Sequence, residues 1–480
     1  QAFKSVNLGE ETFKTKKISF STLRDTCEIL KGFSRMLCEY GVRDYRLVAT
    51  TAIREAANQR YVIDQIRVKT GFRVEVVDMP QEIFYKYSAL FKAVKRGGFT
   101  DNKEAILFVD ISSGGLGFTL YKKEKIIYQQ NIHIGALRIK ESFEKNQRES
   151  VRFSQALIEY ISSTISPVKL ELQKHKIKYL VLSGNETNMT LTMMGRNPQD
   201  ELSIIENHEF ASLYNKLNTL SIPYIMNYYN LSEARAELVL PTIILYREIL
   251  NLTDVGLILV PQTSFSDGVT LHQIAEKTDS HFRNEMQEQL LSLAYAIGHK
   301  YSFDVKHAEA VSNRALVLFD HLHKVHGLGK RERFLLKTTG ILHDIGKYIN
   351  LRKHYFYSYQ LILSSDIFGF SKDEKRIIAN VAYYHSKGTP TEIDANFHVL
   401  NEEEKTLVAK LSAIMRLADA LDRSHRQKSD EFIVQYKSDT LNIYHDSVDD
   451  MTLEEWTFGY KSHFFEEVFG IRAVLHKKGR

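Results

Sequence analysis

The chain has 480 residues, of which 43% are hydrophobic and 26% charged, a composition typical of ordered globular protein with about three domains. Its net charge of +5 is a weak basic bias that fits polyanionic ligands and an ordinary solvated surface equally well. The sequence shows no run of about 18 apolar residues and no basic-then-apolar leader, so we expect no membrane span or secretory signal and a cytoplasmic location.

The first half of the chain alternates helical and strand patterns. Apolar residues recur at helical spacing over residues 19–41 and stop at Gly41, a glycine signal for a helix end. Short runs of β-type residues follow at 45–49, 74–77, 105–109, 179–182 and 256–260. This alternation predicts a mixed α/β half.

The pattern of apolar and polar residues changes after about residue 275. From there to about residue 427 the pattern is helical with no convincing strand, and the last fifty residues return to mixed strand and helix signals. We therefore expect an all-α domain followed by a small α+β domain.

Two loops of small residues directly follow predicted strands. Small residues there let backbone N–H groups approach an anion, so two such loops facing each other would cradle a chain of phosphates. Asp110 lies at the end of its strand, where it would hold a cation. Each loop alone is equally typical of an ordinary turn. The candidate phosphate-binding residues are Ser112, Ser113, Gly114, Gly115, Gly184 and Asn185.

An adjacent His343–Asp344 pair lies inside an apolar helical run, where packing alone would favour neither residue. His307 lies in an apolar helical pattern upstream, and Asp419 lies in another downstream. Burying these four side chains without a cation or a full set of hydrogen bonds would cost several kcal/mol, and their ligand types suit borderline or hard divalent cations. The pattern predicts a metal site, although a histidine on an apolar helix is also typical of a hydrogen-bonded core residue.

The order of these four residues along the chain resembles that of the HD-type metal-dependent phosphohydrolases. In those enzymes the four residues come from separate helices and meet at one or two divalent ions. His385 and His354 are candidate ligands for a second ion. We expect Mn²⁺, Fe²⁺ or Zn²⁺ at this site.

Five segments spread over nearly the whole chain carry a second resemblance. They are residues 48–58, 110–115, 134–138, 384–388 and 416–425. In order and spacing the chain resembles the exopolyphosphatase and guanosine pentaphosphate phosphohydrolase (Ppx/GppA) family, in its long form with a C-terminal HD-like domain. The resemblance implies an α/β actin-like (ribonuclease H-like) two-lobe core, an all-α HD-type domain and a small α+β C-terminal domain. The expected ranges are 1–100 and 101–275 for the lobes, then 276–427 and 428–480.

The resemblance also implies a catalytic site between the lobes. Arg54 would face the phosphates, Glu82 would orient or deprotonate the attacking water, and Asp110 would hold Mg²⁺. The implied reaction is hydrolysis of the terminal phosphoanhydride of polyphosphate or a guanosine polyphosphate. The implied partners are these substrates and a second copy in a homodimer, without nucleic acid or membrane.

Three departures from the family pattern bear on activity. The family's phosphate loop reads Asp-Ile-Gly-Gly-Gly-Ser-x-Glu, but here two glycines are Ser112 and Ser113, and the second acid is Gly117. Glu186 adds a negative charge beside the second loop. The family's opening strand, with its Asp-x-Gly-Ser-Asn loop, would precede Gln1, so the sequence may belong to a longer protein. We expect these departures to weaken catalysis.

Three hypotheses follow for function. The leading one is a Ppx/GppA-type phosphatase with impaired activity between the lobes. The second is an HD-domain phosphohydrolase that acts on a nucleotide or phosphate ester at the helical site, with a metal-activated hydroxide as nucleophile. The third is a catalytically degraded protein that binds a phosphorylated ligand as a sensor.

Overall fold

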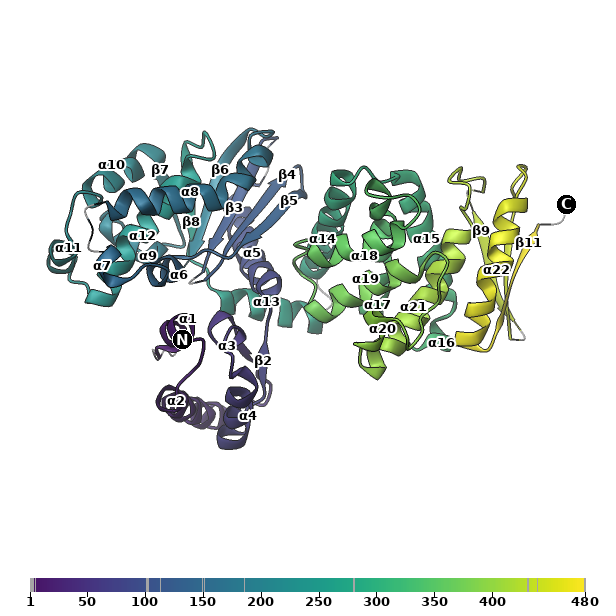
Figure 1. Cartoon of the computed structure of the whole chain (residues 1–480), viewed down its shortest axis with the longest axis horizontal. Coiled ribbons are helices and arrows are strands. Elements are labelled where there is room, and N and C mark those ends of the chain that lie inside the picture. The colour runs from purple at the N-terminus through teal and green to yellow at the C-terminus, as the bar shows by residue number, and fades with distance from the viewer. Residues whose placement is uncertain are drawn as a thin grey trace. The chain divides into compact units, whose positions relative to one another are not determined.

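The computed structural model describes residues 4, 6–100, 103–112, 114–148, 150, 152–184, 186–278, 281–429, 431–437 and 439–478. The chain divides into two compact units, residues 1–289 and 290–480, which run from purple to teal and from teal to yellow in Figure 1. Within these described ranges, no helix is long and apolar enough to cross a membrane.

The first unit begins with helices around a two-stranded parallel sheet. The predicted helix over 19–41 is α2, which starts after Ser19, whose hydroxyl accepts the Thr22 N–H, and stops before Gly41, which adopts a positive φ of 64°. The predicted strands at 45–49 and 74–77 are paired as β1 and β2. The elements are α1 (Leu8–Thr15), α2 (Phe20–Glu39), β1 (Leu47–Ala49), α3 (Thr51–Arg54), α4 (Gln59–Thr70) and β2 (Val74–Val76).

A six-stranded sheet forms the centre of the first unit, in the order β5-β4-β3-β6-β8-β7. The three strands predicted at 105–109, 179–182 and 256–260 are β3, β6 and β8, which run parallel in the middle of the sheet. Three antiparallel strands that flank them were not predicted. The strands are β3 (Ala105–Ile111), β4 (Leu116–Lys122), β5 (Lys125–Ile132), β6 (Ile177–Gly184), β7 (Leu202–Glu206) and β8 (Leu257–Pro261).

Side chains of β3 alternate between two differently covered faces of this sheet. Ala105, Leu107 and Val109 join the large apolar core that includes residues of α8 and α12. The intervening residues face the other way, where the Phe108 ring lies 5.0 Å from the ring of Tyr87 on α5. Asp110 shares that second face because residues two apart on a strand point the same way.

The remaining helices of this unit are α5 (Met79–Arg96), α6 (Ala136–Glu141), α7 (Lys145–Arg148), α8 (Phe153–Leu172), α9 (Thr187–Met193), α10 (Asn207–Leu217), α11 (Ile222–Tyr229), α12 (Glu233–Leu250) and α13 (Phe265–Thr278).

The second unit is helical until its last fifty residues, as predicted. There β9, β10 and β11 form a sheet in the order β11-β10-β9, and α22 contacts both α21 and β11. Its elements, after α14 (His281–Lys300), which begins before the division, are α15 (Val305–His321), α16 (His323–His326), α17 (Lys330–Leu342), the 3₁₀ helix η1 (Ile345–Tyr348), α18 (His354–Ser364), α19 (Lys372–Tyr384), α20 (Ala395–His398), α21 (Glu402–Ala420), β9 (Phe432–Lys437), β10 (Thr440–His445), α22 (Thr452–Phe469) and β11 (Arg472–Lys477).

Helices α15 and α17 cross at a glycine. A Cβ on Gly340 would lie 2.6 Å from the Cα of Ser312, so only glycine lets the two backbones approach this closely. His307 lies on α15 and His343 directly follows α17, so this crossing decides how near the two histidines come.

We predict that Gly340→Ala lowers the free energy of unfolding by about 1–3 kcal/mol, because the new methyl group forces the two helices apart. Urea denaturation of the full chain measures this change. Gly459→Ala is the control: Gly459 lies in α22 with open space around its Cα, so alanine should leave stability unchanged or raise it by up to about 1 kcal/mol. Equal stability of Gly340→Ala and the unmutated chain would contradict the packing argument.

Candidate functional site

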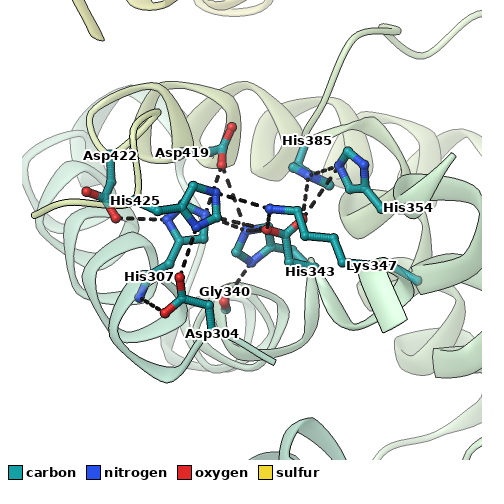
Figure 2. A network of polar contacts seen from close by, with 12 residues as sticks. Asp304, His307, Gly340, His343, Lys347, His354, His385, Asp419, Asp422 and His425 are labelled. Atoms are coloured by element: carbon teal, nitrogen blue, oxygen red, sulfur yellow. Dashed lines mark hydrogen bonds and ion pairs between the residues drawn. The ribbon is translucent and has the colours of Figure 1, made fainter. Parts of the chain in front are cut away.

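The second unit brings four predicted metal ligands to one buried point (Figure 2). His307 Nε2 lies 3.6 Å from Asp344 Oδ2 and 3.4 Å from Asp419 Oδ1. His343 Nε2 lies 3.6 Å and 3.8 Å from the same two oxygens, and 3.4 Å from His307 Nε2. Three stretches of chain supply them: α15, the two residues that directly follow α17, and α21.

A second group of ligand atoms lies on the other side of Asp344. Its Oδ1 is 3.5 Å from His354 Nε2, at the start of α18, and 3.5 Å from His385 Nε2, which follows α19. The two nitrogens are 3.2 Å apart. Asp344 therefore contributes one carboxylate oxygen to each group.

All four histidine rings are held with Nε2 toward the ligand groups. A hydrogen bond at Nδ1 orients each ring and fixes Nδ1 as the protonated nitrogen of the neutral form, so that Nε2 keeps its lone pair. For His307, His343, His354 and His385 respectively, the Nδ1 partners are Asp422 Oδ2 at 2.8 Å, Gly340 O at 2.8 Å, Leu351 O at 3.0 Å and Ala382 O at 2.6 Å.

Electrostatics favour the metal-binding forms of most of these groups. Burial lowers the pKa of His343 to about 3 and that of His354 to about 4, so both rings are neutral near neutral pH. Burial acts to lower the pKa of His307 too, but Asp419 and Asp422 outweigh it and raise that pKa to about 9. The pKa values of Asp344 and Asp419 lie well below normal because neighbouring His343 and Lys461 outweigh the opposing effect of burial. A cation at this point competes with the proton on His307 and with the ammonium group of Lys347, which contacts Asp344 Oδ2.

Asp344 gives the most direct sign that a cation belongs here. Both of its carboxylate oxygens are buried, and neither accepts a hydrogen bond from any described residue. Lys347 Nζ makes an ion-pair contact with Oδ2, but without hydrogen-bond geometry. Metal–ligand bonds of about 2.0–2.2 Å place neighbouring ligand atoms roughly 3–3.6 Å apart, close to the separations in both groups. The residues therefore fit two divalent ions that share Asp344.

Two buried cations that were not predicted hold the ligands in place. Lys461 on α22 contacts Asp419 Oδ2 through Nζ and donates a hydrogen bond of 2.9 Å to the carbonyl oxygen of His385. Arg416 on α21 donates from Nη1 to the carbonyl oxygens of Tyr384, Ser386 and Gly388 at 2.9, 2.7 and 2.7 Å. The segment that carries His385 is thus fixed from both helices.

In the first unit, two predicted catalytic residues and one predicted metal ligand also lie together. Arg54 Nη1 is 3.1 Å from Glu82 Oε2. Lys86, which was not predicted, links Glu82 to Asp110: its Nζ is 3.5 Å from Glu82 Oε1 and 3.0 Å from Asp110 Oδ2. Ser183 donates a hydrogen bond of 2.6 Å to Asp110 Oδ1. We name these five residues the Lys86 cluster.

The Lys86 cluster does not fit the Mg²⁺ ion that the family resemblance implies. Mg²⁺ needs oxygen ligands around it, but Asp110 already directs one oxygen to a hydroxyl and the other to an ammonium group. Burial raises the pKa of Asp110 against the lowering effect of Lys86. For Lys86, Asp110 and Glu82 outweigh burial, and the net change in its pKa is upward. The lysine is therefore charged, and its Nζ lies between the two carboxylates.

The predicted phosphate loops are packed against protein. Gly115 donates its N–H to Ser112 Oγ at 2.9 Å, and the Ser112 N–H donates to Gly115 O at 2.8 Å, so both backbone donors are used within the loop. A Cβ on Gly114 would lie 3.0 Å from atoms of Phe13 and Thr51.

The second loop is close-packed as well. A Cβ on Gly184 would lie 2.6 Å from the carbonyl oxygen of Ile111, so this glycine lets β6 approach β3. Glu186 is buried there, which raises its pKa. Ser113 and Asn185 lie outside the described residues. These glycines have packing roles, and phosphate binding by either loop stays a prediction.

We predict that the purified chain, saturated with Mn²⁺, holds about two ions in the helical unit. Asp344→Asn should lose both, because each group takes one of its oxygens, whereas His354→Ala should lose about one. Inductively coupled plasma mass spectrometry after removal of free metal gives the counts. The control is His398→Ala, which removes an exposed histidine whose ring is 71% accessible. Retention of both ions by Asp344→Asn would contradict a shared carboxylate.

We also predict that Lys461→Met weakens Mn²⁺ binding by about 10–100-fold, because Asp419 and the His385 carbonyl lose the cation that orients them. Calorimetric titration with Mn²⁺ measures the affinity. Tyr460→Phe, a change at the exposed neighbouring residue, should leave the affinity unchanged. An unchanged affinity in Lys461→Met would show that this lysine does not position the ligands.

Comparison with known proteins places both units in one family. Residues 2–276 match the Ppx/GppA phosphatase family, and residues 276–462 match Ppx/GppA phosphatase domain III. A guanosine-5'-triphosphate,3'-diphosphate pyrophosphatase of Photobacterium profundum is 21% identical over 79% of this chain and 73% of its own length. A bifunctional 3-dehydroquinate synthase/phosphatase of Fusobacterium nucleatum is 26% identical over 30% of this chain, which corresponds to 21% of that protein.

A solved structure is similar in fold to more than half of this chain. The crystal structure of an exopolyphosphatase from Cytophaga hutchinsonii matches with a TM-score of 0.50 and 20% identity, over 57% of this chain and 88% of that one. Its likeness agrees with the predicted actin-like architecture. Since the family match alone covers more than half of the sequence, the chain belongs to the Ppx/GppA phosphatase family.

Proposed function

We propose that this chain is a metal-dependent phosphohydrolase of the HD type, with its active centre in the helical unit. The observation that carries the proposal is the shared carboxylate of Asp344, which has two histidine nitrogens beside Oδ2 and two beside Oδ1. Such a centre, with nitrogen ligands and few carboxylates, suits Mn²⁺, Fe²⁺ or Zn²⁺.

Family membership supports the substrate class. Relatives are named for hydrolysis of guanosine polyphosphates or polyphosphate. For this chain we propose a phosphoanhydride or phosphate ester of that kind, a nucleotide polyphosphate or inorganic polyphosphate. The two bound ions would neutralise phosphate charge and lower the pKa of a water molecule toward neutrality.

Lys347 and His425 lie beside the ligands and are proposed to act on substrate. Lys347 Nζ contacts Asp344 and lies 3.1 Å from His425 Nε2, and its side chain is 31% accessible, so it can reach a phosphoryl oxygen. The His425 ring stacks on that of His307 with centroids 3.5 Å apart. Asp304 holds His425 Nδ1 at 3.1 Å, so Nε2, which contacts Lys347 Nζ here, is the nitrogen that would hold or release a proton at the reacting group.

Hydrolysis in the first unit, the leading hypothesis from sequence, remains the second candidate. It is favoured by the proximity of Arg54, Glu82 and Asp110 in one cluster. Against it, these charged groups neutralise one another, and the described loop donors of Ser112 and Gly115 are engaged within their own loop.

We predict that His343→Ala lowers Mn²⁺-dependent phosphate release from polyphosphate or a guanosine polyphosphate by at least about 100-fold, because it removes a ligand of the first ion. Glu82→Gln should retain activity within about threefold, since a helical centre does not use Glu82. A phosphate-release assay with both substrates compares the two variants. The reverse pattern, with Glu82→Gln inactive and His343→Ala active, would place the chemistry in the first unit.

A further inference from the structure

We propose that the Lys86 cluster is a metal-independent site, in which the ammonium group of Lys86 permanently takes the position that a divalent cation would need. This inference concerns the first unit and does not depend on the function proposed for the helical unit. It also departs from the Mg²⁺ that the family resemblance implies.

The position of Lys86 follows from the local structure. Helix α5 begins after Asp78, whose side chain accepts the Gln81 N–H, and this start sets Glu82 and Lys86 one turn apart on the same side of the helix. Asp110 lies on the face of β3 that is turned toward α5. Lys86 Nζ therefore reaches both carboxylates at once, at 3.5 and 3.0 Å.

Burial separates this contact from an ordinary surface ion pair. The side chains of Glu82, Lys86 and Asp110 are 7%, 14% and 6% accessible. Breaking such a pair by removing one partner leaves an uncompensated charge, which strongly destabilises the arrangement. A free divalent ion would have to displace a tethered ammonium group whose two partners lie on α5 and β3.

The side chain of Ile83 fills the space that a second acidic ligand, at position 117, would need. A Cβ on Gly117, the position at which the family pattern has its second acid, would lie 2.8 Å from Ile83 Cδ1 and 2.9 Å from its Cγ2. A carboxylate side chain there would collide with Ile83. The positive charges of Arg54 and Lys86 already balance the negative charges of Glu82 and Asp110.

The same geometry predicts what removing the lysine would do. Without the ammonium group, the oxygens of Glu82 and Asp110 would face each other across the space that Nζ fills. Glu186 adds a buried carboxylate nearby, which interacts electrostatically with both Asp110 and Lys86. Its Oε2 has no hydrogen-bond partner among the described residues. Oxygen ligands of this type suit Mg²⁺ and Mn²⁺. Lys86→Gln should thus create a cation site.

Counting bound Mn²⁺ by electron paramagnetic resonance in four versions of the full chain tests the proposal. These are the unmutated chain, Asp110→Asn, Lys86→Gln and the double variant Lys86→Gln/Asp110→Asn. We expect the same count for the first two, about one additional ion per chain for Lys86→Gln, and loss of that ion in the double variant. Any ions bound by the helical unit contribute equally to all four counts. The comparison therefore holds even if the helical unit binds no metal.

Two results would overturn the proposal. A lower Mn²⁺ count in Asp110→Asn than in the unmutated chain would show that Asp110 already holds a metal. A folded Lys86→Gln with no additional ion would show that the lysine does not occupy a cation position. Circular dichroism establishes folding, and Lys86→Met provides a second neutral replacement of similar length. If neither variant folds, the comparison of Asp110→Asn with the unmutated chain decides.

Discussion

A buried carboxylate with no hydrogen-bond donor, that of Asp344, is the constraint on which the helical unit depends. Lys347 forms an ion pair with one of its oxygens, and the surrounding structure brings imidazole nitrogens of four histidines to within 3.5–3.6 Å of the carboxylate. Glycines make this approach possible: Gly340 lets α15 and α17 cross closely, and a Cβ on Gly346 would lie 2.1 Å from the carbonyl oxygen of His354. Backbone packing therefore sets the ligand geometry before any ion binds.

The two units treat buried acids in opposite ways. In the first unit, lysine, arginine and serine side chains of the protein itself satisfy Glu82 and Asp110, and the result is a closed network. In the helical unit the histidines donate outward from Nδ1 and keep Nε2 toward the centre, and the oxygens of Asp344 have no hydrogen-bond donor among the described residues. A closed network favours rigidity, whereas an open one favours ligand binding. This difference is why we assign the chemistry to the helical unit.

The sequence predicted the fold where the local pattern was strong. The three central parallel strands were found because strands buried on both faces are continuous apolar runs, as over residues 105–109. Strands β4, β5 and β7 were missed: they carry glycine or polar residues and lack a clear run. The helix over 19–41 was found because its apolar spacing is regular and stops at a glycine; the serine that caps its start was not used in the prediction.

Site residues, like the elements of the fold, could be predicted where the local sequence pattern was strong. The candidate ligands of the helical unit could be picked out because a histidine or aspartate in an apolar run is unusual, and the structure brings these residues together. Lys86 and Lys461 were missed, since a lysine on an amphipathic helix normally faces solvent and only tertiary packing buries these two. The close packing of the glycine loops was not predicted, because their neighbours, Phe13 and Thr51 among them, come from distant segments.

The most direct test of a two-ion centre around Asp344 is anomalous X-ray diffraction from crystals of the full chain grown with Mn²⁺. The account predicts two anomalous peaks roughly 3.5–4 Å apart, one on each side of the Asp344 carboxylate, and no peak between Glu82 and Asp110. A peak beside Asp110, with none beside Asp344, would contradict it.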